Sequence, residues 1–223
     1  MSANSSAKRA PRSAELRIGG FVRLSTCDWP GELVATVFCQ GCPWACGYCH
    51  NPHLIPPNAE TGIAWPDVLT FLGRRRGLLD GVVFSGGEPT LQAALPEAMR
   101  AVRALGFRIG LHTAGPYPAR LAQVLPLADW VGFDVKAAFD DYEHITAVAG
   151  SGSRAKASLR HVLASNIACD IRTTVHDALL DRAALARLAS DLAAFGVREH
   201  RLQPFRAAGC INPDLLLQNT ANL

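Results

Sequence analysis

The chain has 223 residues, of which 49% are hydrophobic and 7% aromatic, which is enough apolar material for the core of one ordinary domain. Its formal net charge is +3, and the only dense basic run is Arg74-Arg75-Arg76, so the charge gives no reason to expect a nucleic-acid partner. No uninterrupted apolar stretch approaches the roughly 18 residues of a membrane span, so no membrane partner is expected either.

Residues 1–17 are rich in serine, alanine and arginine and contain no apolar h-region, so they do not form a secretory signal. We expect a disordered tail there, ahead of a single core domain over 18–223; an organelle transit peptide is the weaker alternative. The seven cysteines are odd in number and four crowd into 39–49, whereas a secreted disulfide scaffold spreads an even number. We therefore expect a reducing, cytoplasmic compartment in which the clustered thiols bind metal.

Short apolar runs and longer helical patterns alternate along the rest of the chain, which predicts an α/β fold. The expected strands are 18–25, 33–40, 80–87, 107–115, 129–136, 168–175 and 197–205. The expected helices are 65–77, 91–105, 117–128, 153–165 with a serine cap, and 179–196 closed by Gly196. About six β/α units follow residue 33, too few for a complete eight-fold barrel. The pattern allows a partial (β/α)6 barrel or a doubly wound sheet, both with a parallel sheet, outer helices and a site at the carboxyl ends of the strands.

The most informative motif is Cys42-Pro-Trp-Ala-Cys46-Gly-Tyr-Cys49, which follows the second strand. Iron–sulfur clusters normally take four cysteines, so three thiolates on one loop would hold a [4Fe–4S] cluster and leave one iron open to another ligand. A zinc knuckle is the alternative, with His50 or Cys39 as the fourth ligand, although Cys39 also suits a buried strand end. The spacing alone leaves both open.

The second motif is Ser85-Gly86-Gly87-Glu88-Pro89-Thr90, directly after the strand at 80–87. Paired glycines let a ligand approach the backbone, and Glu88 offers a carboxylate to an ammonium group. The alternative is a plain β-to-α turn in which Thr90 caps the next helix.

The two motifs together resemble the radical S-adenosylmethionine (SAM) superfamily. Within it, the segments from GGFVRLSTCDWPG through FCQGCPWACGYCHNP and SGGEPTL to FDVK, IRTTV and LQPFR are similar to the glycyl-radical enzyme activases, notably the activating proteins of anaerobic ribonucleoside-triphosphate reductase. The resemblance implies a partial (β/α)6 barrel, one [4Fe–4S] cluster and SAM. It implies reductive cleavage of SAM to a 5′-deoxyadenosyl radical that generates a glycyl radical on a partner enzyme, with electrons from a flavodoxin- or ferredoxin-type donor.

The resemblance also implies roles for individual residues. Cys42, Cys46 and Cys49 would ligate the cluster. Tyr48 would lie near the adenine, Asp134 and Lys136 would contact the ribose and carboxylate of SAM, and Arg172 would help to hold the carboxylate. From the residues alone, Asp134 and Lys136 could equally be a surface ion pair and Arg172 a surface arginine. The other expected SAM contacts are Ser85, Gly86, Gly87, Glu88, Thr113 and Arg206.

Two positions depart from related activases. His112-Thr113 stands where some of them carry Asp-Thr, so a monovalent-cation site that uses this aspartate stays open. Arg206 stands where pyruvate formate-lyase activases have a histidine, which argues against that substrate.

The other cysteines and the alternative functions complete the expectations. Cys27, Cys169 and Cys210 are isolated, so each is expected to be a buried structural thiol and only one cluster is predicted. A radical SAM enzyme that acts on a small molecule and a zinc-stabilised, non-catalytic binding module are the alternatives to an activase.

Overall fold

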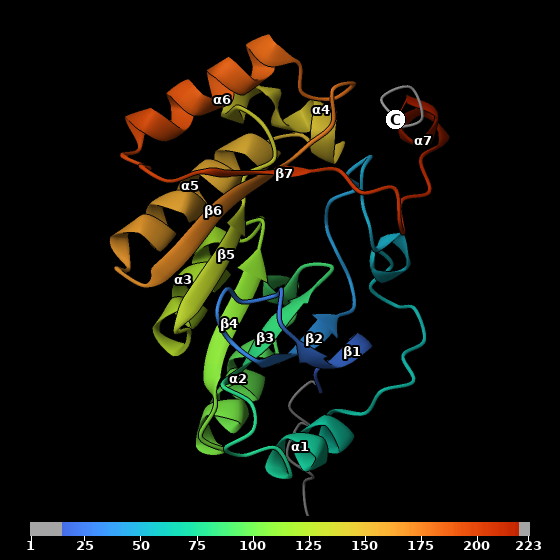
Figure 1. The fold of residues 1–223 in the computed structure, drawn as a ribbon, viewed down its shortest axis with the longest axis vertical. Coiled ribbons are helices and arrows are strands. Elements are labelled where there is room, and N and C mark those ends of the chain that lie inside the picture. Colours follow the sequence, from blue (N-terminus) through green and yellow to red (C-terminus); the bar gives the residue numbers. More distant parts are fainter. Residues whose placement is uncertain (1–14, 219–223) are drawn as a thin grey trace, which may run out of the picture.

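The fold is described by a computed structural model over residues 15–218. One seven-stranded sheet runs through the molecule with its strands in chain order, β1 to β7 (Figure 1). The first strand pairs antiparallel with the second, and every later pair is parallel. The strands are β1 (Ile18–Ser25), β2 (Val34–Cys39), β3 (Gly81–Gly86), β4 (Arg108–Thr113), β5 (Trp130–Asp134), β6 (Ala168–Val175) and β7 (Arg201–Pro204).

The strictly sequential strand order decides between the two expected architectures. A doubly wound sheet reverses its strand order at a switch point, and this sheet does not. Six parallel strands, β2 to β7, curve around one side of the molecule, and the edge strands β1 and β7 do not pair with each other. The partial (β/α)6 barrel with a parallel sheet is therefore confirmed, with β1 added as an antiparallel edge.

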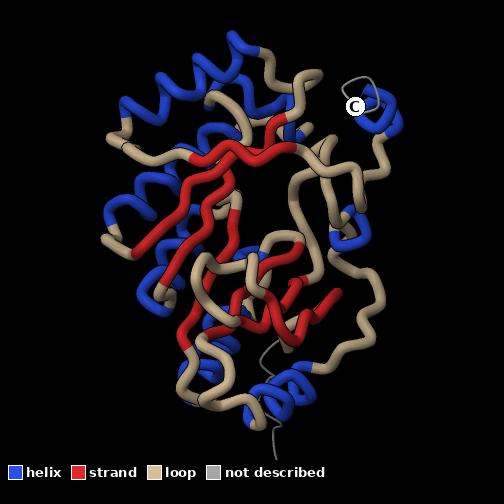
Figure 2. The backbone as a smooth tube through the Cα atoms, in the orientation of Figure 1, coloured by secondary structure: helices blue, strands red, loops and turns tan. Residues whose placement is uncertain are grey.

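Helices cover the outer face of the curved sheet, and the loop after β2 runs along its open side (Figures 1 and 2). The short helices α4 and α7 were not predicted, because five or six residues are too few to show helical periodicity. The helices are α1 (Trp65–Gly73), α2 (Leu95–Ala104), α3 (Pro118–Val124), α4 (Tyr142–Thr146), α5 (Ser151–Ala164), α6 (Arg182–Ala194) and α7 (Pro213–Gln218).

The observed helix termini agree with the predicted capping residues, except for the serine cap of one helix. Pro96 lies in the first turn of α2, where its missing N–H costs nothing. The Asp181 carboxylate caps α6 by accepting from the Ala184 amide at 2.7 Å, and Gly196 follows that helix with φ of 75°. The predicted serine cap of the helix at 153–165 is wrong: α5 begins two residues earlier, after Gly150, and has no side-chain cap.

Apolar side chains of the strands fill the core between sheet and helices. Phe84, Leu111 and Phe133, from three neighbouring strands, have no exposed surface. Burying a side chain of this size stabilises a fold by about 1.5–3 kcal/mol. This packing holds the strands against the helices and so positions the strand ends that form the site.

The predicted boundary of the N-terminal tail is too late. Residues 1–14 lie outside the described residues, but Leu16 is buried in the core, and the Arg17 backbone exchanges hydrogen bonds with Gln92. The expectation of buried thiols also needs correction, because Cys27 and Cys169 are exposed while Cys210 is buried. None of the helices within 15–218 has the length and hydropathy needed to cross a bilayer.

Candidate active site

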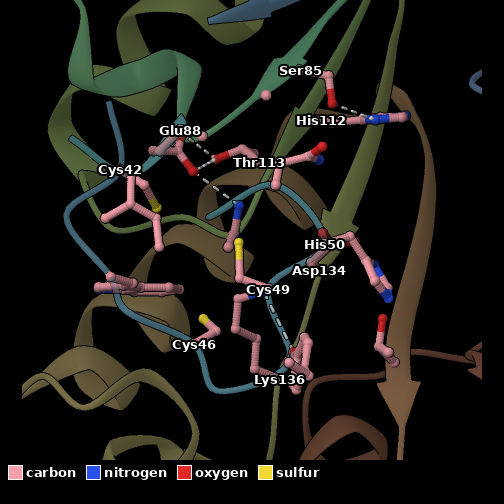
Figure 3. A pocket seen from close by; sticks show the side chains of 18 of the residues that line it. Cys42, Cys46, Cys49, His50, Ser85, Glu88, His112, Thr113, Asp134 and Lys136 are labelled. Carbon is pink, nitrogen blue, oxygen red and sulfur yellow. Dashed lines mark hydrogen bonds between the residues drawn. The ribbon is translucent and has the colours of Figure 1, made fainter. Parts of the chain in front are cut away.

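A pocket at the carboxyl ends of the parallel strands collects almost all of the predicted site residues (Figure 3). It holds about 900 Å³ of space free of protein atoms, its open mouth included. Of the residues expected at the site, only Arg206 does not line it; that side chain is exposed on the segment after β7. The predicted residues in the lining are Cys42, Cys46, Tyr48, Cys49, Ser85, Gly86, Gly87, Glu88, Thr113, Asp134, Lys136 and Arg172.

The cysteine loop is held by backbone hydrogen bonds on two sides. On one side, the Cys42 amide donates to the Ile55 carbonyl at 3.0 Å. On the other, the Ala45 amide donates to the Thr146 carbonyl at the end of α4, also at 3.0 Å. The sulfur atoms of Cys42, Cys46 and Cys49 point into a common space (Figure 3). The loop therefore presents its thiols from a fixed backbone.

The paired glycines bring two backbone segments together. A Cβ at Gly86 would collide with the Cys39 backbone, and a Cβ at Gly87 with the Gly41 carbonyl. The Gly87 amide donates to the Cys39 carbonyl at 3.0 Å, and the Glu88 amide to the Gly41 carbonyl at 2.8 Å. The glycines are thus required by the close packing of the β3 end against the residues that lead into Cys42.

The Glu88 carboxylate, which we expect to face an ammonium group of the ligand, is engaged by several donors of the protein. It is 2% exposed and accepts from the backbone amides of Thr90 at 3.0 Å and Ala114 at 3.1 Å. The hydroxyls of Thr90 and Thr113 also donate to it, so four groups occupy the carboxylate. Burial raises the pKa of Glu88, and these donors act in the opposite direction. Its carboxylate, and not Thr90, caps the turn after β3.

Three charged side chains, Asp134, Lys136 and Arg172, form a polar wall of the same pocket. The Arg172 Nε donates to Asp134 Oδ1 at 2.5 Å, and the Lys136 Nζ lies 3.5 Å from the Tyr48 hydroxyl and 5.3 Å from its ring centroid. Desolvation raises the pKa of Asp134, but Arg172 and Lys136 outweigh it and hold the pKa below its usual value. Desolvation lowers the pKa of Lys136, but the acidic groups around it raise it well above the usual value. Asp134 and Lys136 are thus both charged at neutral pH.

The Nη1 and Nη2 groups of Arg172 have N–H donors available for a ligand. Among the described residues, neither Nη1 nor Nη2 of this side chain has a carboxylate or carbonyl acceptor, although the guanidinium lines the pocket. A planar pair of N–H donors suits an anionic group such as a carboxylate. The surface-arginine alternative is wrong, because the side chain is only 12% exposed.

Several lining residues were not predicted as SAM or cluster contacts, although His50 was considered as a zinc ligand and His112 in connection with a cation site. Trp44 lies between Cys42 and Cys46, and His50 follows Cys49. The indole Nε1 of Trp44 and the Nε2 of His50 are buried without a hydrogen-bond partner among the described residues. No periodicity or charge pattern marks them, but their position inside the motif could have suggested them. The others are Asn51, Ile55, His112, Ala114 and Thr174.

The donor set fits an iron–sulfur cluster better than a single metal ion. Within residues 15–218, no group of three or more His, Cys, Asp or Glu side chains surrounds one point closely enough for one ion. A cubane cluster instead needs separated thiolates, each on a different iron, and its sulfides accept hydrogen bonds of the kind that Trp44 and His50 have free. Desolvation raises the pKa of Cys42 to about 12 and raises that of Cys46, so their thiolate forms need a bound cation.

Comparison with known proteins agrees with this geometry. The family model described as "Radical SAM superfamily" matches residues 36–188. The chain belongs to the radical SAM superfamily. The alternative function, a non-catalytic module in which the cysteines bind zinc, is therefore excluded. The superfamily implies SAM and a [4Fe–4S] cluster as cofactors, and residues 36–188 include all three cysteines and the charged wall.

Two curated relatives are named as activases. A Methanocaldococcus jannaschii protein with the provisional name glycyl-radical enzyme activating enzyme is 30% identical over 174 residues, which are 74% of this chain and 70% of that protein. The pyruvate formate-lyase-activating enzyme of Clostridium pasteurianum is 33% identical over 144 residues, which are 62% of this chain and 59% of that enzyme. These likenesses support the radical SAM activases as this chain's family.

Solved structures show the same fold at low identity. Streptococcus suis SuiB bound to S-adenosylmethionine has a TM-score of 0.60 at 15% identity and covers 82% of this chain and 44% of its own. Native anSMEcpe with bound AdoMet has a TM-score of 0.57 at 15% identity and covers 75% of this chain and 49% of its own. Both support the partial-barrel fold.

Proposed function

We propose that this radical SAM enzyme generates a glycyl radical on a partner enzyme. The bound cluster and SAM would supply the chemistry: one electron enters the sulfonium, the C5′–S bond breaks, and methionine and a 5′-deoxyadenosyl radical result. That radical would take a hydrogen atom from a backbone glycine of the partner, which would leave 5′-deoxyadenosine and a glycyl radical. The observation that carries the proposal is that three cysteines of one loop share a pocket with the charged wall of Asp134, Lys136 and Arg172.

We assign the cluster to Cys42, Cys46 and Cys49, and the SAM site to the rest of the pocket. The Nη1 and Nη2 donors of Arg172 suit the carboxylate of SAM, and Lys136 adds a second positive charge beside them. Tyr48 is 6% exposed and held against Lys136, a suitable place for an apolar contact with the adenine. Ser85, Thr113 and Glu88 bond to protein groups, so their part in the site is to hold its shape.

The partner we propose is an anaerobic ribonucleoside-triphosphate reductase. The activase names of the two relatives support a glycyl-radical partner, and Arg206 in place of a histidine argues against pyruvate formate-lyase. The unpaired edges β1 and β7 leave the barrel open, which supports a macromolecular substrate. Arg206 lies outside the pocket, on the exposed segment after β7, so a role there would be toward the partner and not toward SAM.

The setting we propose for this reaction is the cytoplasm. None of the seven cysteines is in a disulfide, which supports a reducing compartment. A flavodoxin- or ferredoxin-type protein would supply the electron. We further propose that the residues from Leu16 onward form one domain, because Leu16 packs into the same core cluster as the later strands.

The test is an anaerobic assay of the reconstituted protein. The protein is loaded with iron and sulfide, reduced with dithionite and mixed with SAM, and 5′-deoxyadenosine is measured by chromatography. The same mixture with purified anaerobic ribonucleotide reductase is examined by electron paramagnetic resonance. We expect 5′-deoxyadenosine in the first experiment and a glycyl-radical doublet in the second.

The outcomes separate the alternatives. If the cluster-loaded protein makes no 5′-deoxyadenosine, the radical SAM assignment of this pocket is wrong. If it makes 5′-deoxyadenosine but no doublet on the reductase, the partner is wrong. A doublet on pyruvate formate-lyase instead would reverse the interpretation of Arg206, and turnover with a small molecule would favour the alternative function.

A further inference from the structure

His112 lies on β4 in the pocket lining, and its two ring nitrogens contact two other segments. Its Nδ1 is 3.1 Å from the Ser85 hydroxyl at the end of β3, and its Nε2 is 2.8 Å from the backbone carbonyl of Asp28 in the β1–β2 turn. The Asp28 carboxylate accepts from the Thr36 hydroxyl at 2.6 Å, which anchors that turn on β2. The imidazole is therefore fixed at both of its nitrogens.

These contacts determine the tautomer. A carbonyl oxygen only accepts, so at 2.8 Å from Asp28 the Nε2 must carry the proton and donate it. Nδ1 then accepts from the Ser85 hydroxyl. Desolvation lowers the pKa of His112 to about 4, so the ring is neutral at neutral pH. Ser85 and the Asp28 carbonyl together hold one neutral form of the ring in one orientation.

The ring forms one side of a slot that holds Arg172. The Arg172 Nη1 lies 3.5 Å from His112 Nε2, and because both atoms are donors this contact is packing and not a hydrogen bond. On the other side, Asp134 accepts from the Arg172 Nε at 2.5 Å. Beneath the slot, a Cβ at Gly132 would lie 2.8 Å from the His112 Cδ2 and 3.1 Å from the Arg172 Nη1, so only glycine leaves room for both side chains.

We propose that His112 is the positioning residue that aims Arg172 at the bound anionic group: it takes no donor from the guanidinium, and it stops the guanidinium from turning away from the pocket. This inference rests on the proposed function, in which the anionic group is the SAM carboxylate. A side chain with a free acceptor at this position would bind Nη1 and remove a donor from the ligand. The neutral, fully engaged imidazole provides the wall without that competition.

The experiment compares His112→Phe and His112→Gln in the cluster-loaded protein, with SAM affinity measured by calorimetry and iron content and melting temperature measured beside it. The phenylalanine ring keeps volume but loses both anchors, so we expect SAM affinity to fall about tenfold, the effect of misaligning one charge-assisted hydrogen bond. Glutamine can still donate to the Asp28 carbonyl, but its Oε1 is an acceptor that can bind Arg172 Nη1, so its SAM affinity should fall as well while its fold is kept. His161→Phe, on the exposed face of α5, is the matched control.

A double-mutant cycle separates positioning from a merely structural role. If His112 acts through Arg172, then His112→Phe should cost little further SAM affinity in an Arg172→Lys background. Equal losses in both backgrounds would overturn the proposal, as would a His112→Phe protein with wild-type affinity. If His112→Phe does not fold, the same cycle run with His112→Gln decides the question. Failure of the wild type to bind SAM would instead refute the proposed function.

Discussion

The Glu88 carboxylate offers the sharpest test of how the pocket is built. In Glu88→Ala, the amides of Thr90 and Ala114 lose their acceptor inside the protein, whereas the two threonine hydroxyls can reorient. Each orphaned buried amide costs about 1–3 kcal/mol, so the loss should be about 4 kcal/mol, out of about 5–15 kcal/mol for a typical domain. Glu88→Gln keeps one oxygen and loses the Ala114 bond, so it should cost about 2 kcal/mol.

The same variants should lose iron as they lose stability. The Glu88 amide bonds to the Gly41 carbonyl, one residue before Cys42, so a loosened turn after β3 loosens the start of the cysteine loop. The assay is anaerobic urea unfolding of the reconstituted protein together with iron and sulfide analysis and SAM affinity. The control is Glu97→Gln, at an exposed residue of α2 whose one ion pair within residues 15–218 is with Arg100, and it should change none of these.

One result would refute this reasoning. If Glu88→Ala unfolds at the wild-type urea concentration and keeps its iron, but binds SAM at least about tenfold more weakly, then the carboxylate contacts the ligand directly. The Glu88 carboxylate would then bind SAM instead of holding the turn after β3.

Three further predictions follow from the same geometry. Cys46→Ala should keep at most a depleted cluster and form no 5′-deoxyadenosine; wild-type turnover would contradict the cluster assignment. Gly87→Ala should lose iron and stability because its Cβ would collide with the Gly41 carbonyl, whereas Gly62→Ala, with open space around it, should lose neither in the same assays. The pKa of His112 falls from 6.5 to about 4 on folding, so between these pH values His112 is protonated in the unfolded chain and neutral in the folded protein. The free energy of unfolding should therefore fall by about 3 kcal/mol as pH drops from 6.5 towards 4. His112→Gln should flatten this loss in urea unfolding at several pH values, and an unchanged slope would refute the assignment.

The location of the site could be predicted because it depends on short-range features. A strand ending in a cysteine loop, a second strand ending in Gly86-Gly87 and a third ending at Asp134 are all visible in the sequence. Parallel strands bring their carboxyl ends to one edge, so the pocket follows from the alternation of strands and helices alone.

What each side chain does there could not be predicted, because its partners come from distant segments. Glu88 looked free beside its glycines, yet two of its donors, Thr113 and Ala114, follow 25 and 26 residues later. For Arg172, only the resemblance suggested a role at the site, since its own neighbours in the sequence also fit a surface arginine; the fold places His112 and Asp134 on either side of it. Burial and partner choice are properties of the folded chain, and no local pattern encodes them.

The segment after β7 reaches back to the cysteine loop. Phe205 stacks on His50 with ring centroids 5.5 Å apart, Gly209 packs against the His50 carbonyl, and the Cys210 thiol lies 3.8 Å from the Gly47 carbonyl, across 163 residues of sequence. The cysteine loop is thus bridged to a segment far along the chain, and its final shape depends on residues 205–210 having docked against it.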